Sequence, residues 1–374
     1  RRHDTPVPGV QRQRGRPWIA SPIQDRLAAR GAVFGEVAGF ERARWFADRP
    51  GAHDANGWRR QPWHERVAAE CRAVAERAGV LDLGAFAQFQ VSGRDAPALL
   101  DRLSANRIPV RRSRVTLNHF LNEAGRFETE MTITRLADDR FLLGSAIGGQ
   151  WKDRDWLARH VQPGESVTVA DWTRTHGLLA VSGPASREIL AGGTGADLTS
   201  ASFPWLTGQE ITLFGESVIL LRVSFTGELG YEIHAPVESI ATLYDALHEA
   251  GAGVGLADFG SHALNALRME KAYKASGELT PDVGMVGADM MRFFRPDNRR
   301  FVGREATLRD QEGPGRWRLV YLEVDAPDAD CHGGEPIVSN GDAVGLTTSG
   351  GFGHRSGKSL AFGFLRTDRA VAGD

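Results

Sequence analysis

The chain has 374 residues and a formal net charge of −2, because 45 basic side chains nearly balance 47 acidic ones. This balance is not typical of a polyanion-binding protein, and no arginine cluster interleaved with aromatic residues predicts a nucleic-acid surface. Only two cysteines occur, Cys71 and Cys331, which argues against a disulfide framework and a structural zinc site and favours the reducing cytoplasm. No apolar run approaches the roughly 20 residues that span a bilayer, so we expect a soluble protein without a membrane segment.

The chain opens with an arginine-rich stretch, RRHDTPVPGVQRQRGRPW, and no apolar signal-peptide core follows it. We expect this stretch to form a poorly ordered or partner-wrapping arm. Residues 62–79 then carry an amphipathic helical pattern, in which Val67, Cys71 and Val74 lie on one stripe. Gly79, just beyond this stripe, is a typical helix stop signal.

A strand–turn–helix unit then occurs twice. In the first copy, a strand over 85–93 leads into Val-Ser-Gly and a helix that carries Leu99, Leu100 and Leu103. In the second copy, residues 177–193 (GLLAVSGPASREILAGG) repeat the same order of elements. The repeat predicts two related α+β halves, each packing helices on one face of a mostly antiparallel sheet.

Between the two copies, residues 127–134 predict a strand with two different faces. Side chains alternate along an extended chain, so Phe127, Met131 and Ile133 share one face with Thr129. The opposite face carries a polar row, which consists of Glu128, Glu130, Thr132 and Thr134. From the residues alone, this row is either a solvated sheet face or the wall of a pocket that holds a cationic or protonated group.

A hairpin is predicted over 218–236, where two strands flank a glycine-containing loop and Glu232 lies between Tyr231 and Ile233. Two helical patterns follow it, ESIATLYDALHEAG and DFGSHALNALRMEKAY. From about residue 315 the pattern changes to short β runs, which predict a separate small β-barrel or sandwich. The abrupt polar end at Asp374 leads us to expect that a last strand of this unit is missing.

The glycine-rich stretches do not predict a nucleotide site. In GGFGHRSGKS (350–359), Phe352 stands where a phosphate loop needs its first glycine, so a hairpin turn is expected. GAGVGLADFG (251–260) follows a helix and is expected to connect two helices. We therefore predict no FAD or NAD site in this chain. No histidines have metal-ligand spacing, so we also predict no metal site. No nucleophile elbow occurs, which argues against acyl-transfer chemistry.

Six motifs occur in order across most of the chain, and together they carry a family resemblance. The sequence resembles the folate-binding, C-terminal half of the dimethylglycine/sarcosine dehydrogenase family, which is similar to the glycine-cleavage T-protein (aminomethyltransferase). The first motif resembles the dehydrogenases in particular. The six motifs are GAVFGEVAGFERARWFA (31–47), FLNEAGRFETEMTITRL (120–136), SFTGELGYEIHAP (224–236), ALNALRMEKAYKASGELTPDVGM (263–285), FVGREA (301–306) and TSGGFGH (348–354).

The resemblance implies an α+β, three-lobed T-protein-like module, with two related lobes around a central channel and a small C-terminal β-barrel. It places a basic arm and a linker to an oxidising domain or partner in residues 1–58. The folate-binding, aminomethyltransferase-like core then occupies residues 59–310. The β-barrel domain, expected to be truncated, occupies residues 311–374.

The resemblance also implies tetrahydrofolate-dependent one-carbon transfer. An iminium or formaldehyde from oxidative N-demethylation would be captured as 5,10-methylene-tetrahydrofolate, with FAD on a partner subunit or a missing domain. Two alternatives stay open. One is direct methyl transfer from an O-, S- or N-methyl donor to tetrahydrofolate, and the other is a non-catalytic structural subunit with a degenerate folate site.

The resemblance assigns roles to particular residues. Glu130 matches the family's catalytic aspartate, and its side chain is one methylene longer. Thr132 and Glu232 match residues that contact the pterin, and Ser145 and Phe225 stand where the related proteins have asparagine and tyrosine. The predicted cofactor-binding set is therefore Glu232, Thr132, Ser145, Phe225, Phe86 and Tyr231.

Three departures from the family pattern accompany this assignment. Leu264 stands where the T-protein has an arginine that meets the folate tail, and His262 and Arg268 are close in sequence without matching that position. Arg126 replaces the second glycine before the acid. The contact with the folate tail is therefore expected to be lost.

Overall fold

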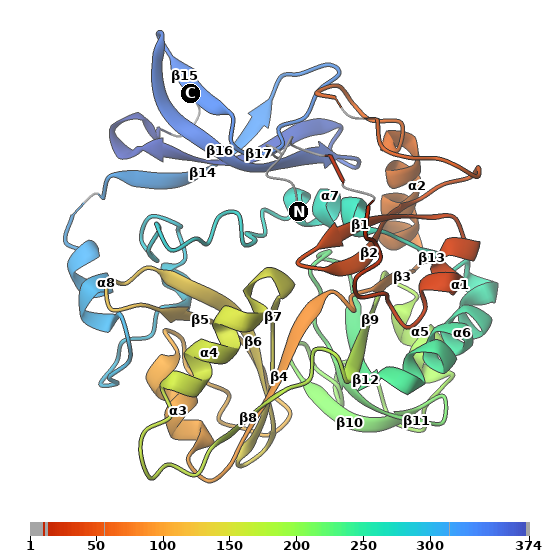
Figure 1. Cartoon of the computed structure of the whole chain (residues 1–374), viewed down its shortest axis with the longest axis horizontal. Helices are drawn as coiled ribbons and strands as arrows, with labels where there is room; N and C mark the ends of the chain where they lie inside the picture. The colour runs from red at the N-terminus through yellow and green to blue at the C-terminus, as the bar shows by residue number, and fades with distance from the viewer. Residues whose placement is uncertain (1–9, 12–13, 56, 314, 372–374) are drawn as a thin grey trace.

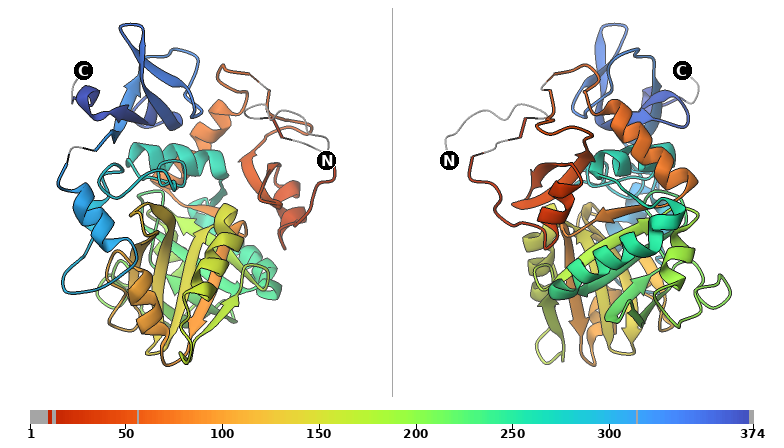
Figure 2. Two further views of the ribbon diagram at one scale, coloured as in Figure 1. Left: turned by 60° about the vertical axis from the view of Figure 1, so that its left-hand side comes forward. Right: turned by 90° about the vertical axis from the view of Figure 1, so that its right-hand side faces the viewer.

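The computed structural model describes residues 10–11, 14–55, 57–313 and 315–371 (Figure 1). Most of the predicted arginine-rich arm lies outside these residues. Two β-sheets lie side by side in the lower half of the view, and a third sheet, formed by the C-terminal residues, lies above them (Figures 1 and 2). The predicted α+β, T-protein-like fold class is confirmed, with two sheet lobes and a small C-terminal β domain.

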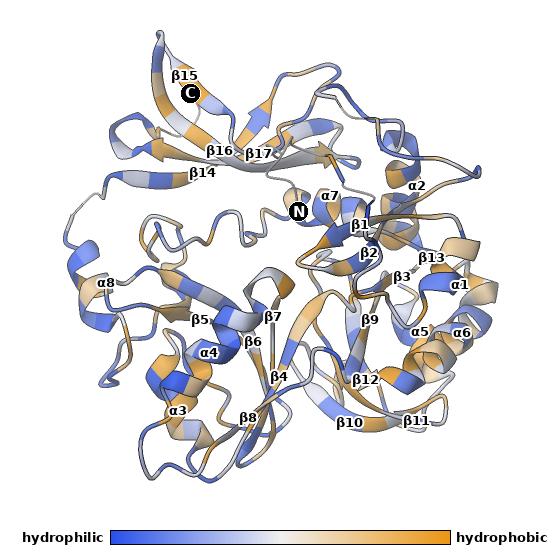
Figure 3. Ribbon diagram, in the orientation of Figure 1, coloured by the Kyte–Doolittle hydropathy of each residue, from blue (hydrophilic) through white to orange (hydrophobic). Residues whose placement is uncertain are grey.

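The first lobe contains an antiparallel five-stranded sheet in the order β5-β6-β7-β4-β8. Helices α3 (Ala96–Leu103) and α4 (Gln150–Arg159) pack on the sheet, and α4 is largely hydrophilic along its length (Figure 3). Leu99 of α3 and Trp156 of α4 share one buried cluster with Phe89 and Met131 from the strands. The strands are β4 (Phe86–Ser92), β5 (Val115–Leu121), β6 (Phe127–Ala137), β7 (Arg140–Ala146) and β8 (Thr168–Asp171).

The second lobe contains a six-stranded sheet in the order β10-β11-β12-β9-β3-β13, with α5 (Ser186–Ala191) and α6 (Ile240–Gly251). Leu190 of α5 and Leu243 of α6 pack with Ile233 of the sheet in a second buried cluster. The stretch 251–260 is more than the predicted connection between helices, because it contains β13, which pairs in parallel with β3. The strands are β3 (Gly79–Asp82), β9 (His176–Ser182), β10 (Gly208–Leu213), β11 (Glu216–Leu221), β12 (Gly230–Pro236) and β13 (Ala257–Asp258).

The predicted strand–turn–helix repeat is present in both lobes. β4 leads through Gly93 into α3, and β9 leads through Gly183 into α5. The two glycines have nearly equal positive φ values, +120° and +123°. A β-carbon at Gly93 would collide with the Ser166 carbonyl oxygen, and one at Gly183 would lie 2.6 Å from the Arg77 carbonyl oxygen. Both positions therefore need glycine for conformation and for space.

Strand β6 departs from simple alternation at its start, because its register with β5 shifts near Glu128. Phe127 consequently packs in a different buried cluster from Met131 and Ile133. Glu128 contacts Lys152 of α4, with 3.7 Å between its carboxylate and the ammonium group. The predicted face is correct for Met131 and Ile133, whereas it is wrong for Phe127 because of this bulge.

The N-terminal segment packs onto the lobes. It forms α1 (Gln24–Ala29) and a hairpin of β1 (Ala32–Val37) and β2 (Phe40–Phe46). Phe40 belongs to the core cluster of the first lobe, and Phe46 to that of the second. Trp45 packs between α2 (His64–Glu76) and α7 (Ser261–Glu270). Residues of this N-terminal segment therefore contribute to the cores of both lobes.

The C-terminal unit is an antiparallel four-stranded sheet in the order β14-β17-β16-β15. Helix α8 (Arg304–Asp310) precedes it. The first hairpin of this sheet turns at Asn340 and Gly341, both with positive φ. The stretch GGFGHRSGKS contains the end of one strand, the turn at 354–357 and the start of the last strand. The strands are β14 (Trp317–Val324), β15 (Pro336–Ser339), β16 (Asp342–Gly353) and β17 (Lys358–Arg366).

Five single-turn 3₁₀ helices complete the described secondary structure: Ile147–Gly149, Val237–Ser239, Ala252–Val254, Met291–Phe293 and Thr367–Arg369. Within the described ranges, no helix combines the length and the apolar character that crossing a membrane requires.

Candidate functional site

Glu130 lies on β6, directly opposite His119 on β5. The His119 Nε2 atom is 2.8 Å from Glu130 Oε2, and because an ionised carboxylate only accepts, the Nε2–H donates. The Glu130 side chain is 27% exposed, whereas the His119 side chain is completely buried. The histidine therefore holds one carboxylate oxygen from inside the protein, while part of Glu130 remains accessible.

The surroundings of His119 favour a neutral ring. Its ring centroid lies 5.4 Å from those of Phe127 and Phe293, and its Nδ1 atom is buried without a hydrogen-bond partner. A second proton on Nδ1 would place a charge and an unpaired donor among aromatic rings, at a cost of several kcal/mol. A neutral His119 with its proton on Nε2 leaves the negative charge on Glu130.

Thr132 and Phe86 lie beside Glu130 on the same face of the first sheet. Thr132 is opposite Gly144 on β7, and Phe86 is opposite Ala146, two residues further along β7. A β-carbon at Gly144 would lie 3.0 Å from Thr132 Oγ1 and 3.3 Å from the Phe86 ring. The absence of a side chain at Gly144 therefore lets the hydroxyl and the aromatic ring approach each other.

Glu232 lies on β12 of the second sheet, and its side chain is 18% exposed. Its Oε2 atom is 3.4 Å from the Nε2 atom of His234, two residues along the same strand face. The Nδ1 atom of His234 is in turn 2.7 Å from Oε1 of Gln88, a buried residue on β4 of the first sheet. The contact between Gln88 and His234 joins the two lobes next to the predicted site.

Two predicted cofactor-binding residues lie on other faces. Tyr231 is completely buried in the core of the second lobe, where its hydroxyl accepts a hydrogen bond from Arg187 at 3.1 Å. Ser145 is also buried and donates to Asp153 of α4 at 2.7 Å. Strand alternation directs both side chains to the strand faces opposite those of Glu232 and Thr132. Burial raises the pKa of Asp153, despite this hydrogen bond.

Phe225, another predicted cofactor contact, lies in the loop between β11 and β12 and is 38% exposed. Its ring stacks on Tyr273 with 5.8 Å between centroids. This aromatic pair joins the loop to the segment that follows α7. Phe225 thus remains available to a ligand on its exposed side.

The residues that depart from the family pattern have structural partners. Arg126 pairs with Asp310 at 2.5 Å, and Arg268 is buried against Glu278 at 3.4 Å. His262 stacks on Trp63, and burial lowers the pKa of His262 to about 3. Leu264 lies with the apolar residues between α2 and α7. Each of these side chains therefore has a contact within the protein.

Three residues of the site were not among the predicted ones: His119, His234 and Gln88. The position of His234 two residues after Glu232 on one strand could have identified it, because such residues share a face. His119 and Gln88 depend on strand pairing and on lobe packing, which the sequence did not give. Across the residues that the structure describes, no group of three or more His, Cys, Asp or Glu side chains could hold a metal ion.

Comparisons with known proteins agree with this architecture. The chain is 34% identical to human dimethylglycine dehydrogenase and 34% identical to 4-methylaminobutanoate oxidase (formaldehyde-forming) of Paenarthrobacter nicotinovorans, over 98% of its own length in each case. It spans only 43% and 45% of those proteins. The crystal structure of glycine cleavage system aminomethyltransferase T from Bartonella henselae shares the fold, with a TM-score of 0.81, 24% identity and coverage of 95% of this chain and 91% of that one.

Two domain families match the chain directly. Residues 23–298 match the GCVT N-terminal domain, and residues 318–374 match the glycine cleavage T-protein C-terminal barrel domain. The first match begins at residue 23, directly before α1, so it includes the N-terminal hairpin, in agreement with the packing of that hairpin. With both domains present in order, the chain belongs to the glycine cleavage T-protein (GCVT) family.

Proposed function

We propose that this chain binds tetrahydrofolate and captures a one-carbon unit on it, as the folate-binding part of an N-demethylating dehydrogenase or oxidase. Glu232 would bind the pterin and Glu130 would accept the proton that the reaction releases. The product would be 5,10-methylene-tetrahydrofolate, formed from an iminium or formaldehyde.

The observation that carries this proposal is a pair of accessible carboxylates with unusual partners. Glu130 and Glu232 come from different lobes, and each contacts a buried histidine. Among the described side chains, neither pairs with an arginine or a lysine, whereas the nearby Glu228 contacts both Lys271 and Arg355. A carboxylate without a cationic partner can accept hydrogen bonds from a ligand without first breaking an ion pair.

The residues present suit a reduced pterin. A pterin offers adjacent N–H donors, which match the two oxygens of one carboxylate, and a flat ring, which matches the face of an aromatic side chain. Glu232 supplies the carboxylate, Phe86 the ring, and Thr132 a hydroxyl that can donate or accept. These groups differ in lobe and strand, so a ligand that binds all of them would lie between the lobes.

When bound, tetrahydrofolate would supply the nucleophilic nitrogen that takes up the one-carbon unit. The chain's own contribution is acid–base chemistry and orientation. Glu130 would accept a proton at its accessible oxygen while His119 keeps the other oxygen in place. Glu232, Thr132 and Phe86 would fix the orientation of the ligand relative to Glu130, which raises the fraction of productive encounters.

The oxidation step would take place outside this chain. The relatives named above are a dehydrogenase and an oxidase, and the chain spans less than half of each. We therefore expect an FAD-bearing domain or subunit to generate the one-carbon unit. Direct methyl transfer to folate would need no such partner, and a structural subunit would need no folate.

Isothermal titration calorimetry with tetrahydrofolate, under anaerobic conditions, tests the proposal. We expect micromolar binding that Glu232→Ala weakens at least about tenfold, because charged hydrogen bonds each contribute about 1.5–3 kcal/mol. Glu249→Ala is the matched control, since Glu249 is an exposed glutamate on α6. An absence of binding at millimolar ligand would instead support the structural subunit. Dependence of turnover on a flavoprotein distinguishes oxidative capture from direct methyl transfer.

A further inference from the structure

Arg42, on strand β2 of the N-terminal hairpin, combines two properties that rarely occur together. It is exposed, and within the described ranges its guanidinium has no hydrogen bond, ion pair or aromatic ring as a partner. Burial nevertheless lowers the pKa of Arg42, and the neighbouring charge of Arg44 lowers it further. Protein therefore surrounds this guanidinium on most sides, although solvent still reaches it.

Arg268 shows what an arginine in such surroundings ordinarily has. Burial lowers the pKa of Arg268 as well, and its guanidinium lies 3.4 Å from the Glu278 carboxylate. It also donates to the Ser349 hydroxyl at 2.9 Å. A partly desolvated charge is costly unless such partners compensate it. Arg42 has no such compensation from the described residues, which indicates a partner that comes from a bound molecule.

A β-bulge explains why Arg42 is left without a carboxylate. The pairing of β1 with β2 skips Arg44. A β-carbon at Gly35, the partner of Arg42 in the hairpin, would collide with the Arg44 side chain, so the two arginines lie side by side. Asp54 forms an ion pair with Arg44 and accepts from the Trp45 indole N–H at 2.9 Å. Asp54 thus neutralises Arg44 and leaves Arg42 unpaired.

Arg42 shares one face of the hairpin with Trp45. Their partners on β1 are Gly35 and Val33, which are two residues apart and therefore point to the same side. Trp45 is buried in a cluster with residues of α2 and α7, and this cluster also contains Ala180 of β9. The face of the hairpin that carries Arg42 is therefore turned towards α7 and β9, as the position of β2 beside α7 in Figure 1 also shows.

Ala180 connects this face of the hairpin to the candidate site. It pairs with Glu232 across strands β9 and β12, and directly opposed residues of an antiparallel pair lie on one face of the sheet. Phe40, near the start of β2, packs in the core of the first lobe. The hairpin thus contacts both lobes, and Arg42 and Glu232 face the same side of the second sheet.

The first turns of α7 add no second charge beside Arg42. Burial, followed by the charges of Arg44 and Arg42, lowers the pKa of His262 to about 3, so this histidine is neutral at pH 7. Leu264, which stands where the T-protein has its folate-tail arginine, packs among apolar residues. A guanidinium is present beside α7 nevertheless, because the hairpin supplies it.

We propose that Arg42 binds a carboxylate group of the ligand that lies between the lobes. A guanidinium presents parallel N–H donors that match the two oxygens of a carboxylate. Two molecules carry this chemistry: tetrahydrofolate, in its glutamate tail, and an N-methylated amino acid that delivers the one-carbon unit. The proposal deepens the proposed function and rests on it for the identity of the ligand.

Calorimetry on the full chain with three ligands tests this role and separates the two sources. The ligands are tetrahydrofolate, 6-methyltetrahydropterin, which lacks the tail, and dimethylglycine. If Arg42 binds the tail, Arg42→Gln weakens tetrahydrofolate binding at least about tenfold and 6-methyltetrahydropterin binding less than about threefold. If it binds the amino acid, the same variant weakens dimethylglycine binding at least about tenfold and leaves tetrahydrofolate affinity unchanged.

Arg49→Gln is the matched control, since Arg49 is an exposed arginine just after β2, and it should change none of these affinities. If neither tetrahydrofolate nor dimethylglycine shows binding that depends on Arg42, the proposal is overturned.

The melting temperature of the ligand-free chain distinguishes binding from a structural role. Arg42→Gln removes an unpaired charge that protein surrounds, so the melting temperature should stay the same or rise. A clearly lower melting temperature would mean that the charge has a stabilising partner within the chain, and it would overturn the proposal.

Failure of the proposed function would be recognised separately. A wild type that binds neither tetrahydrofolate nor 6-methyltetrahydropterin would overturn that function. Dimethylglycine and 4-aminobenzoyl-glutamate, which is the tail without the pterin, would then decide the carboxylate site. Binding of either that Arg42→Gln removes would support the site, and binding of neither would overturn it.

Discussion

At the residue scale, the distinctive feature is the glutamate at position 130. Its side chain is one methylene longer than that of the aspartate that the family resemblance matches to this position. Nε2 of the completely buried His119 holds Oε2 of this glutamate at 2.8 Å. A longer side chain that is fixed at its end loses less precision than a free one would.

Glu130→Gln should abolish most one-carbon capture and leave tetrahydrofolate affinity within a few-fold of wild type. The amide keeps the size of the side chain but does not accept a proton at neutral pH, and general-base catalysis contributes about 10²–10⁴-fold. The measurement is the rate of capture from formaldehyde above the uncatalysed rate, together with calorimetry. Glu249→Gln is the control, and a parallel loss of affinity would contradict the separate roles of Glu130 and Glu232.

At the element scale, one buried carboxylate connects the N-terminal hairpin to two helices through hydrogen bonds. Glu70 of α2 accepts the backbone N–H of Phe46 at 2.7 Å and that of Gly260 at 2.8 Å. It thereby links β2, α2 and the start of α7. Burial raises the pKa of Glu70 to about 7, in spite of these two hydrogen bonds.

This raised pKa predicts a pH dependence of stability. The folded state binds the Glu70 proton more tightly than the unfolded state, whose glutamate titrates near 4.5, so stability from this group falls as pH rises from about 4.5 to 7. The difference in melting temperature, wild type minus Glu70→Gln, should therefore decrease between pH 5 and pH 8. Glu76→Gln, an exposed substitution on the same helix, should show no such trend. An equal trend in both variants would exclude Glu70 as the cause.

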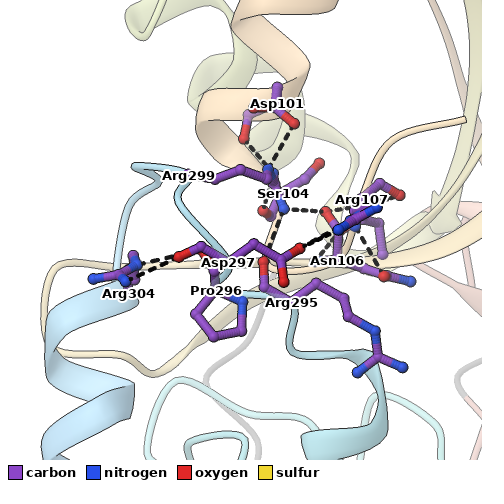
Figure 4. A network of polar contacts seen from close by, with 10 residues as sticks. Asp101, Ser104, Asn106, Arg107, Arg295, Pro296, Asp297, Arg299 and Arg304 are labelled. Carbon is purple, nitrogen blue, oxygen red and sulfur yellow. Dashed lines mark hydrogen bonds and ion pairs between the residues drawn. The ribbon is translucent and has the colours of Figure 1, made fainter. Parts of the chain in front are cut away.

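Arg299 caps the C-terminal end of α3, as the close-up in Figure 4 shows. Its guanidinium donates to the carbonyl oxygens of Asp101 at 2.8 Å and Ser104 at 2.9 Å, and it pairs with the Asp101 carboxylate at 2.8 Å. It also donates to the Asn106 carbonyl oxygen at 3.1 Å. A cation at this end satisfies free carbonyl groups and complements the helix dipole.

Arg299→Ala should destabilise the protein by about 1–3 kcal/mol, because several carbonyl groups would lose their donor at once. Arg300→Ala is the control, since Arg300 is the exposed neighbour in sequence. Chemical denaturation measures both variants. Equal stability of the two would mean that water replaces the guanidinium without cost.

At the scale of the whole molecule, a buried ion pair joins the core to the C-terminal sheet. Glu278 is completely buried and accepts from the hydroxyls of Thr348 at 2.7 Å and Ser349 at 2.6 Å. Arg268 of α7 lies 3.4 Å from Glu278 and donates to Ser349 at 2.9 Å. β16 is thereby bound to α7 and to the segment that follows it.

Glu278→Ala should cost about 3–5 kcal/mol, since it leaves the Arg268 charge buried without its partner. We expect limited proteolysis to cleave the variant earlier than the wild type between the core and the C-terminal sheet. We also expect a lower melting temperature. Glu323→Ala removes an exposed pair with Lys358 and should cost no more than about 1 kcal/mol. A similar small effect of both substitutions would show that the buried pair does not hold the two units together.

Much of the fold followed from local patterns. The repeat around Gly93 and Gly183 predicted two similar lobes, because a positive φ and a close backbone contact restrict both positions to glycine. The alternation of β6 correctly placed Met131 and Ile133 in the core. Phe127 is buried as predicted, but it lies on the other face of the sheet, because a bulge depends on the partner strand and not on the strand itself.

The sequence by itself predicted which carboxylates act, since Glu130 and Glu232 stand within the ordered motifs and Glu130 lies on a polar strand face. It did not determine their partners. Sheet pairing brings His119 to Glu130, and lobe packing brings Gln88 to His234, a residue 146 positions away. Tertiary structure also decided what Tyr231 and Ser145 contact on the opposite faces of their strands, which are Arg187 and Asp153. The physical reason is that local sequence specifies the direction of a side chain along its strand, whereas contacts between strands and lobes decide what that side chain meets.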